Sequence, residues 1–146
     1  MAASGMAEFA LVYPMAAMVL LTGIVLVRMV RGRFAAVKSG QVDARFYKTY
    51  QDGTEPRAAA QNSRHFANLF ENPVLFYAAC MVGMITGQGT GVIVWLAWAY
   101  VACRVAHAVV HMGSNKIPPR MMVYAASWVV LLAMWVVLVV GVAAAR

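Results

Sequence analysis

The sequence predicts an all-α integral membrane protein whose chain crosses the bilayer four times. Of its 146 residues, 63% are hydrophobic and only 12% are charged, whereas a soluble domain carries about 25% charged residues. Four apolar runs are each long enough to cross about 30 Å of hydrocarbon as a helix. The basic residues, which give a net charge of +7, gather at the ends of these runs, the pattern that sets membrane orientation.

The first predicted helix covers about residues 9–30 and ends at a basic residue, Arg31. A cleaved signal peptide is a poorer interpretation, because the start carries Glu8 and no Lys or Arg, and the apolar run is longer than a signal core. The polar, basic stretch 31–58 predicts a cytoplasmic loop, with a short interfacial helix around residues 44–50.

The second predicted helix covers about residues 59–86, and Pro73 within it predicts a kink, since proline cannot donate to the carbonyl one turn back. A short, uncharged, glycine-rich turn predicts a tight hairpin into the third helix, about 92–112. A Pro-Pro pair suits the first turn of the fourth helix, about 118–144. The prediction is therefore a single four-span domain that covers residues 1–146, a four-helix bundle.

Lys and Arg counts in the loops predict the orientation of the chain. The 31–58 loop and the turn before the fourth helix hold most of the basic residues, and the turn 87–91 holds none. Both basic loops are therefore expected in the cytoplasm and both termini on the other side of the membrane.

Because no basic patch is interleaved with aromatic residues, nucleic-acid binding is excluded. The two cysteines lie in apolar runs and are interpreted as packing residues.

Three of the predicted spans carry a polar stripe at helical spacing, so that each stripe lies on one helix face. The stripes consist of Arg64, Asn68 and Glu71; of Arg104, His107 and His111; and of Arg120, Tyr124 and Ser127. Ionisable groups in lipid usually face the bundle interior. With three arginines against one carboxylate, the stripes predict an anionic ligand with two carboxylates that enters from the cytoplasm.

Two other interpretations of the stripes stay open. They could form a purely structural network in which Arg104 pairs with Glu71 and Asn68 bridges them. His107 and His111 could also hold a metal or haem groups. Because His65 is expected near the surface, no third histidine is expected at the same depth, and no metal site is predicted.

The stripes also resemble a known family. The second helix carries Arg64, Asn68 and Glu71 followed by Pro73, the third carries Arg104, His107 and His111, and the fourth begins Pro118-Pro119-Arg120 with Tyr124 after it. Over residues 61–77 and 104–124 this pattern resembles the MAPEG family, the membrane-associated proteins in eicosanoid and glutathione metabolism. The resemblance is to a bacterial-type member similar to microsomal glutathione transferase.

The resemblance implies a homotrimer that binds glutathione, as a co-substrate, at subunit interfaces open to the cytoplasm. Arg120 matches the arginine that stabilises the glutathione thiolate. A guanidinium in that place favours the thiolate, which is the nucleophile. The other positions that the resemblance assigns to glutathione are Arg31, Arg64, Asn68, Glu71, Arg104, His107, His111 and Tyr124.

The leading hypothesis is a glutathione-dependent transferase or peroxidase of a bacterial inner membrane, acting on lipophilic electrophiles. The partners it implies are further copies of the chain, membrane lipid and a lipophilic small-molecule substrate. A second hypothesis is a non-catalytic structural member that binds glutathione or lipid. A third is a small transporter or a haem protein.

Overall fold

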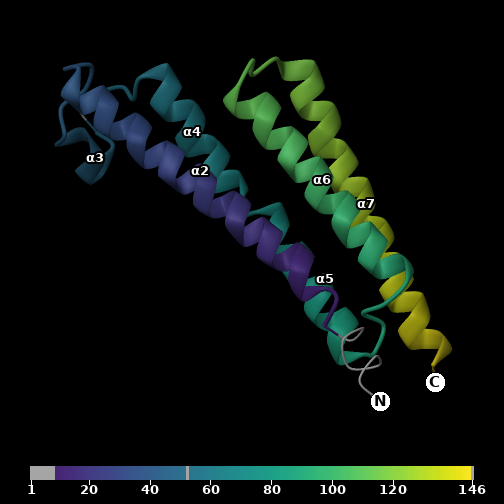
Figure 1. The fold of residues 1–146 in the computed structure, drawn as a ribbon. Helices are drawn as coiled ribbons and strands as arrows, with labels where there is room; N and C mark the ends of the chain where they lie inside the picture. Colours follow the sequence, from purple (N-terminus) through teal and green to yellow (C-terminus); the bar gives the residue numbers. More distant parts are fainter. Residues whose placement is uncertain (1–8, 52, 146) are drawn as a thin grey trace.

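The computed structural model describes residues 9–51 and 53–145, and the described chain is predominantly α-helical with no β-strand. Its helices are α2 (Val12–Lys38), α3 (Phe46–Thr49), α4 (Arg57–Asn68), α5 (Asn72–Ile85), α6 (Val92–Met112) and α7 (Ile117–Ala144). Four spans are long and apolar enough to cross a membrane, the second being α4 and α5 together. They lie side by side as a bundle (Figure 1). The predicted all-α class and the four spans are confirmed.

Each span buries one stripe of side chains and turns apolar residues outward. Along α2 the buried residues recur every three or four positions, and the side chains between them are exposed and apolar. The buried set includes Pro14, Met18, Leu21, Val25 and Met29, and the exposed set includes Val19, Leu20, Ile24 and Val27. Such an apolar outer face is suited to contact with the hydrocarbon of a lipid bilayer rather than with water.

The first helix is longer than predicted. The sequence places its end near residue 30 and begins a loop at residue 31, but α2 continues to Lys38. No proline interrupts this extension, Ala36 within it is buried, and basic residues are favourable near a helix C-terminus. The chain turns only at Gly40, whose φ of +70° is a conformation that glycine adopts readily.

The second span is broken rather than kinked. α4 ends at Asn68 and α5 begins at Asn72, with Pro73 in its first turn. Proline has no N–H to continue the ladder, and its ring clashes with the carbonyl four residues earlier, while it fits the start of a new helix. Glu71, in the turn between, has a non-helical φ of −96° and ψ of −89°.

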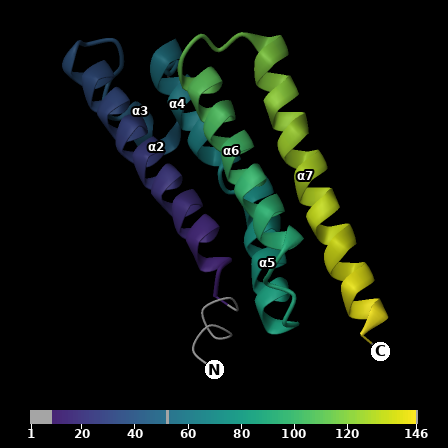
Figure 2. The same ribbon diagram turned by 45° about the vertical axis from the view of Figure 1, so that its right-hand side comes forward.

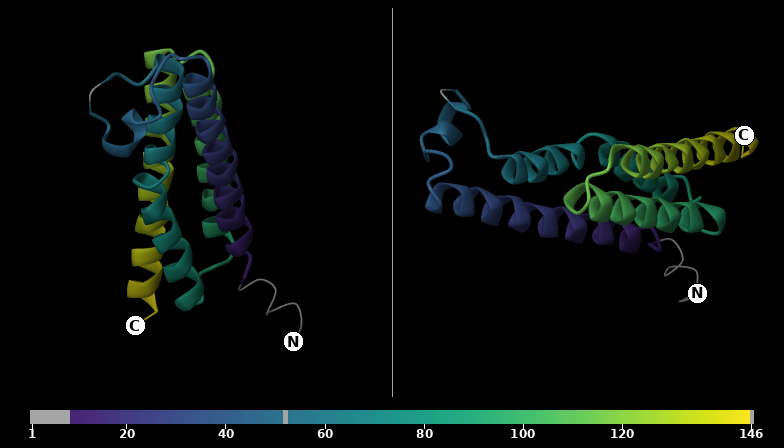
Figure 3. Two further views of the ribbon diagram at one scale, coloured as in Figure 1. Left: turned by 90° about the vertical axis from the view of Figure 1, so that its left-hand side faces the viewer. Right: turned by 90° about the horizontal axis from the view of Figure 1, so that it is seen from above.

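The segment between α2 and α4, which contains α3, lies beside the end of the bundle (Figure 3). Contacts of Arg33 fasten it there. Arg33 Nε lies 3.4 Å from Glu55 Oε1, its Nη2 donates to Ser63 Oγ at 3.0 Å, and its guanidinium lies over the Tyr47 ring, 5.1 Å from the centroid. Burial, followed by the nearby Glu55 carboxylate, raises the pKa of Tyr47. This network holds α3 beside the end of the bundle.

The apolar core fills the half of the bundle around α5. There the Phe76 and Tyr100 rings stack with centroids 4.4 Å apart, and the Tyr100 hydroxyl donates to Asn72 Oδ1. Leu131, Met134 and Leu138 of α7 are buried with them. Towards the other end, where the α6–α7 connection and α3 lie (Figure 2), the buried face of α6 becomes polar. That end holds the candidate site.

Candidate functional site

One buried face of α6 supplies the centre of the site. Tyr100, Arg104, His107 and His111 are all buried and are spaced by four, three and four residues, so they follow one face of the helix. His107 and His111 are also close enough to interact with α4 and with the start of α7. The helix therefore passes from an apolar core at one end to a polar site at the other.

Arg104 is fully buried, yet its charge has no carboxylate partner. Its Nη2 donates to Asn68 Oδ1 at 2.6 Å and lies 3.4 Å from the Asn68 carbonyl. Its Nε and Nη1 are buried and have no hydrogen-bond partner, and its guanidinium lies 5.7 Å from the centroid of the Tyr124 ring. Within the described part of the chain, the one ion pair is that of Arg33 with Glu55. A buried cation of this kind is costly unless a ligand balances it.

The direct pair expected between Arg104 and Glu71 is not formed. Asn68 lies between them: it accepts from Arg104, and its Nδ2 donates to Glu71 Oε2 at 3.4 Å. Glu71 is exposed because the break between α4 and α5 takes it out of helical geometry. The bridging role expected of Asn68 is present, and the charge pair is not.

Arg120 is half-buried at the start of α7 and is fixed by two contacts. Its Nη1 donates to Asn115 Oδ1 at 2.7 Å, and its carbonyl oxygen lies 3.2 Å from His107 Nδ1. Asn115 has a φ of +48°, and asparagine is among the residues that tolerate this left-handed conformation. The turn before α7 thus positions the guanidinium and links it to α6.

An open pocket of about 290 Å³ brings together side chains of α4, α6 and α7. Six of the nine predicted site residues line it, with Met121 beside them: Arg64, Asn68, His107, His111, Arg120 and Tyr124. Of the other three, Arg104 and Glu71 reach it through Asn68. Arg31 is exposed on α2 and lines a separate groove with Arg28, so a single chain does not bring it to the pocket.

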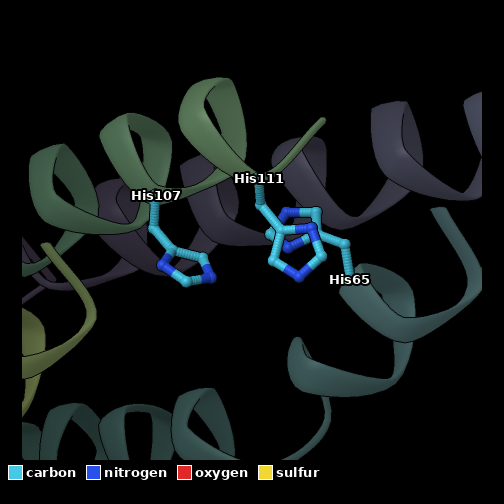
Figure 4. A group of neighbouring side chains, drawn as sticks. All are labelled: His65, His107 and His111. Atoms are coloured by element: carbon cyan, nitrogen blue, oxygen red, sulfur yellow. The ribbon is translucent and has the colours of Figure 1, made fainter. Parts of the chain in front are cut away.

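The sequence predicts His65 near the surface, and this prediction is wrong. His65 is fully buried. It projects from α4 towards His107 and His111 of α6 (Figure 4), and one ring nitrogen of each of the three lies within 4.8 Å of the others. His65 and Asn68 lie at i and i+3 on one face of α4, and this spacing contained the signal. Its position beside exposed Arg64 hid that face.

Two further residues were not predicted from the sequence. Asn115 positions Arg120, and Gln61 of α4 donates from its side-chain amide to the carbonyl oxygen of His111. Single polar side chains that serve a backbone carbonyl or a neighbouring guanidinium follow no spacing rule. No sequence signal would have indicated them.

Fold and site together define an integral membrane protein of four spanning helices with a cationic pocket at one end of its bundle. The profile of the MAPEG family matches residues 11–140, a range that contains every residue of the pocket, and the chain belongs to this family. Comparisons with curated proteins and with solved structures gave no significant match.

Proposed function

We propose that the protein is a glutathione-dependent membrane transferase or peroxidase that acts on lipophilic electrophiles. One observation carries this: buried Arg104 has two unpartnered nitrogens beside a pocket that also holds Arg64 and Arg120. Three guanidinium groups and one carboxylate suit a ligand with two carboxylates, one amino group and an ionisable thiol. Membership of the MAPEG family supports glutathione as that ligand.

Each charged side chain has a role in this proposal. Arg64 and Arg104 bind the two carboxylates of glutathione, and the exposed Glu71 carboxylate binds its amino group. Arg120 stabilises the thiolate, because a guanidinium within hydrogen-bond distance favours the charged form of a thiol. Asn68, His107, His111 and Tyr124 complete the polar lining. The thiolate then attacks an electrophilic carbon, a C–S bond forms, and the leaving group departs.

The substrate in this proposal is lipophilic because the pocket adjoins the apolar outer surface. Met121 lines the pocket and is itself 62% exposed. Other apolar side chains near the start of α7 are exposed too. A molecule dissolved in the hydrocarbon can therefore approach the thiolate without crossing water.

We further propose that the working unit is a homotrimer in a bacterial inner membrane, with both basic loops in the cytoplasm. The pocket is open on one side in a single chain. In a trimer, the outer groove of α2 that holds Arg31 would close a neighbour's pocket. The Lys and Arg residues of residues 31–58 and of the turn before α7 support the orientation.

The alternative is a non-catalytic member that binds glutathione or lipid. One contact favours it: Arg120 already donates to Asn115, so its guanidinium has a structural partner. In that case Arg120 would serve to fasten the start of α7 and would not act on a thiol.

Substitution of Arg120 by glutamine separates the two functions. Purified wild-type protein should bind glutathione in calorimetry and show thiolate absorbance on binding. Arg120→Gln should lose most of that absorbance, by tenfold or more in thiolate fraction, because about 1.4 kcal/mol of lost stabilisation raises the thiol pKa by one unit. Binding should fall less, since the carboxylate contacts remain.

Arg45→Gln is the matched control, because Arg45 is exposed and lies outside the pocket, and it should leave both signals unchanged. Binding without thiolate absorbance in the wild-type protein would favour the non-catalytic alternative. Absence of binding altogether would overturn the proposal.

A further inference from the structure

All three histidines of the chain meet in one buried cluster at the polar end of the bundle. His65 comes from α4, and His107 and His111 come from α6 (Figure 4). We propose that these three imidazoles form a binding site for a divalent transition-metal ion, with Zn²⁺ as the best match. His107 and His111 also line the pocket proposed for glutathione, but zinc binding by the cluster does not require that glutathione binds.

The spacing of the rings suits a shared ion. The ring centroids of His65 and His111 are 4.8 Å apart, and each lies 5.5 Å from that of His107. Three nitrogens that lie within 4.8 Å of one another share a centre no more than about 2.8 Å from each, against a Zn–N bond of about 2.0–2.1 Å. A small rotation of each ring, which moves its nitrogen by less than about 1 Å, would bring the nitrogens to the Zn–N bond length.

The cluster also has unsatisfied donors and acceptors. Both nitrogens of His65, Nε2 of His107 and Nδ1 of His111 are buried without a hydrogen-bond partner among the described residues. The three side chains are 0%, 3% and 8% exposed. Buried polar groups without partners are costly and rare. An ion that accepts their lone pairs would remove that cost at several atoms at once.

The hydrogen bond of His107 fixes which of its nitrogens can bind. Nδ1 lies 3.2 Å from the Arg120 carbonyl oxygen, and a carbonyl only accepts, so Nδ1 carries the proton. In the neutral ring Nε2 then presents a lone pair. Metal-binding histidines commonly hold their second nitrogen to a backbone carbonyl in this way. His111 is also held, because its backbone carbonyl accepts from the Gln61 amide.

The ligand set indicates the ion. Three imidazoles with no thiolate or carboxylate in the cluster suit a borderline metal such as Zn²⁺ and exclude Ca²⁺ and Mg²⁺, which require oxygen ligands. Three protein ligands leave the fourth tetrahedral position open. The pocket arginines oppose a cation, so the fourth ligand is hydroxide or another anion. His107 and His111 line the pocket, which gives that ligand its access.

The test is metal binding by tag-free protein in detergent, without glutathione. After incubation with Zn²⁺ and dialysis, elemental analysis should find one zinc per chain, and zinc should raise the melting temperature. Co²⁺ in place of zinc should give visible absorption bands of a tetrahedral site without sulfur charge transfer. Retention of no zinc together with no Co²⁺ spectrum would overturn the proposal, whatever the protein does with glutathione.

His65→Gln tests the assignment, because His65 is the one cluster member outside the proposed glutathione-binding set. Its affinity for Zn²⁺ should fall at least a hundredfold while glutathione binding stays within threefold. Cys103→Ser, a half-buried change on α6, is the control and should keep the wild-type affinity. Unchanged zinc affinity in His65→Gln would contradict the site. Should that variant not fold, His111→Gln must show the same loss.

Discussion

Two arginines of this chain, Arg33 and Arg104, differ in the partners available to their guanidinium groups. Arg33 has a carboxylate partner in Glu55, a hydroxyl acceptor in Ser63 and an aromatic face in Tyr47. Arg104 is more deeply buried and has one side-chain acceptor, Asn68, with two nitrogens unpartnered. The first arrangement stabilises the fold. The second costs stability in the absence of a ligand and is typical of a site that binds one.

Replacement of each arginine by methionine should therefore change stability in opposite directions. Arg104→Met removes an uncompensated buried charge and should raise the melting temperature of the ligand-free protein, while the stabilisation by added glutathione disappears. Arg33→Met removes the ion pair with Glu55 and the hydrogen bond to Ser63 and should lower stability by about 1 kcal/mol. Thermal unfolding in detergent with and without glutathione measures both. A fall in ligand-free stability for Arg104→Met as large as that for Arg33→Met would show that Arg104 is structural.

At the scale of helices, composition predicted the class and packing decided the details. Four apolar runs were sufficient to predict an all-α protein with four spans. The end of α2 at Lys38 could not be predicted, because the basic residues Arg31 and Arg33 resemble the start of a loop. Only the structure shows that Arg33 is still helical and contacts Glu55 and Ser63. Pro73 indicated a disturbance, but not whether the helix would bend or stop.

The candidate site, like the helices, could be predicted from the sequence in outline but not in detail. Helical spacing predicted inward faces for Arg64, Asn68, Arg104, His107 and Arg120. The structure brings them to one end of the bundle, but Arg64 is exposed. The position of His65 was predicted wrongly, since depth in a bundle depends on which helix covers a face and not on distance from the helix end. The absence of a direct bond from Arg104 to Glu71 follows from the helix break, which changes the direction of Glu71.

Gln88, in the turn between α5 and α6, contacts α7. Gln88 donates to the Leu138 carbonyl at 3.3 Å, and its amide occupies the space where a Cβ on Gly141 would lie. Gly141→Leu should displace Gln88 and reduce stability by about 1–3 kcal/mol. In a Gln88→Ala background most of that cost should vanish, because the two changes act on one contact. Val140→Leu, at an exposed neighbour, should be nearly neutral in the same unfolding assay.

For the whole molecule, the open pocket and the apolar outer faces predict assembly. Native mass spectrometry of detergent-released protein should show three copies of the 15.8 kDa chain, and mild crosslinking should give dimers and trimers. Arg31→Ala should weaken glutathione binding about tenfold without changing the mass of the assembly. A monomer that binds glutathione with full affinity would contradict both the trimer and the role of Arg31.

Orientation is a separate property of the whole molecule. A C-terminal alkaline phosphatase fusion, active only outside the cytoplasm, should be active, and a C-terminal green fluorescent protein fusion should be dark. Both results are expected from the proposed orientation, in which the basic loops face the cytoplasm. The reverse pair of results would place the pocket on the other side of the membrane, where cytoplasmic glutathione does not reach it.

The broken second span has a consequence for biogenesis. It is the least apolar of the four candidate spans, it carries Arg64 and Glu71, and its helix stops halfway at residues 69–71. Charged residues and an interrupted backbone both weaken partition of a lone helix into lipid. The segment therefore depends on contact with its neighbours, α2 first, to remain in the bilayer as the nascent chain leaves the ribosome. The polar residues of the pocket are therefore expected to make insertion of the second span depend on the helices that pack against it.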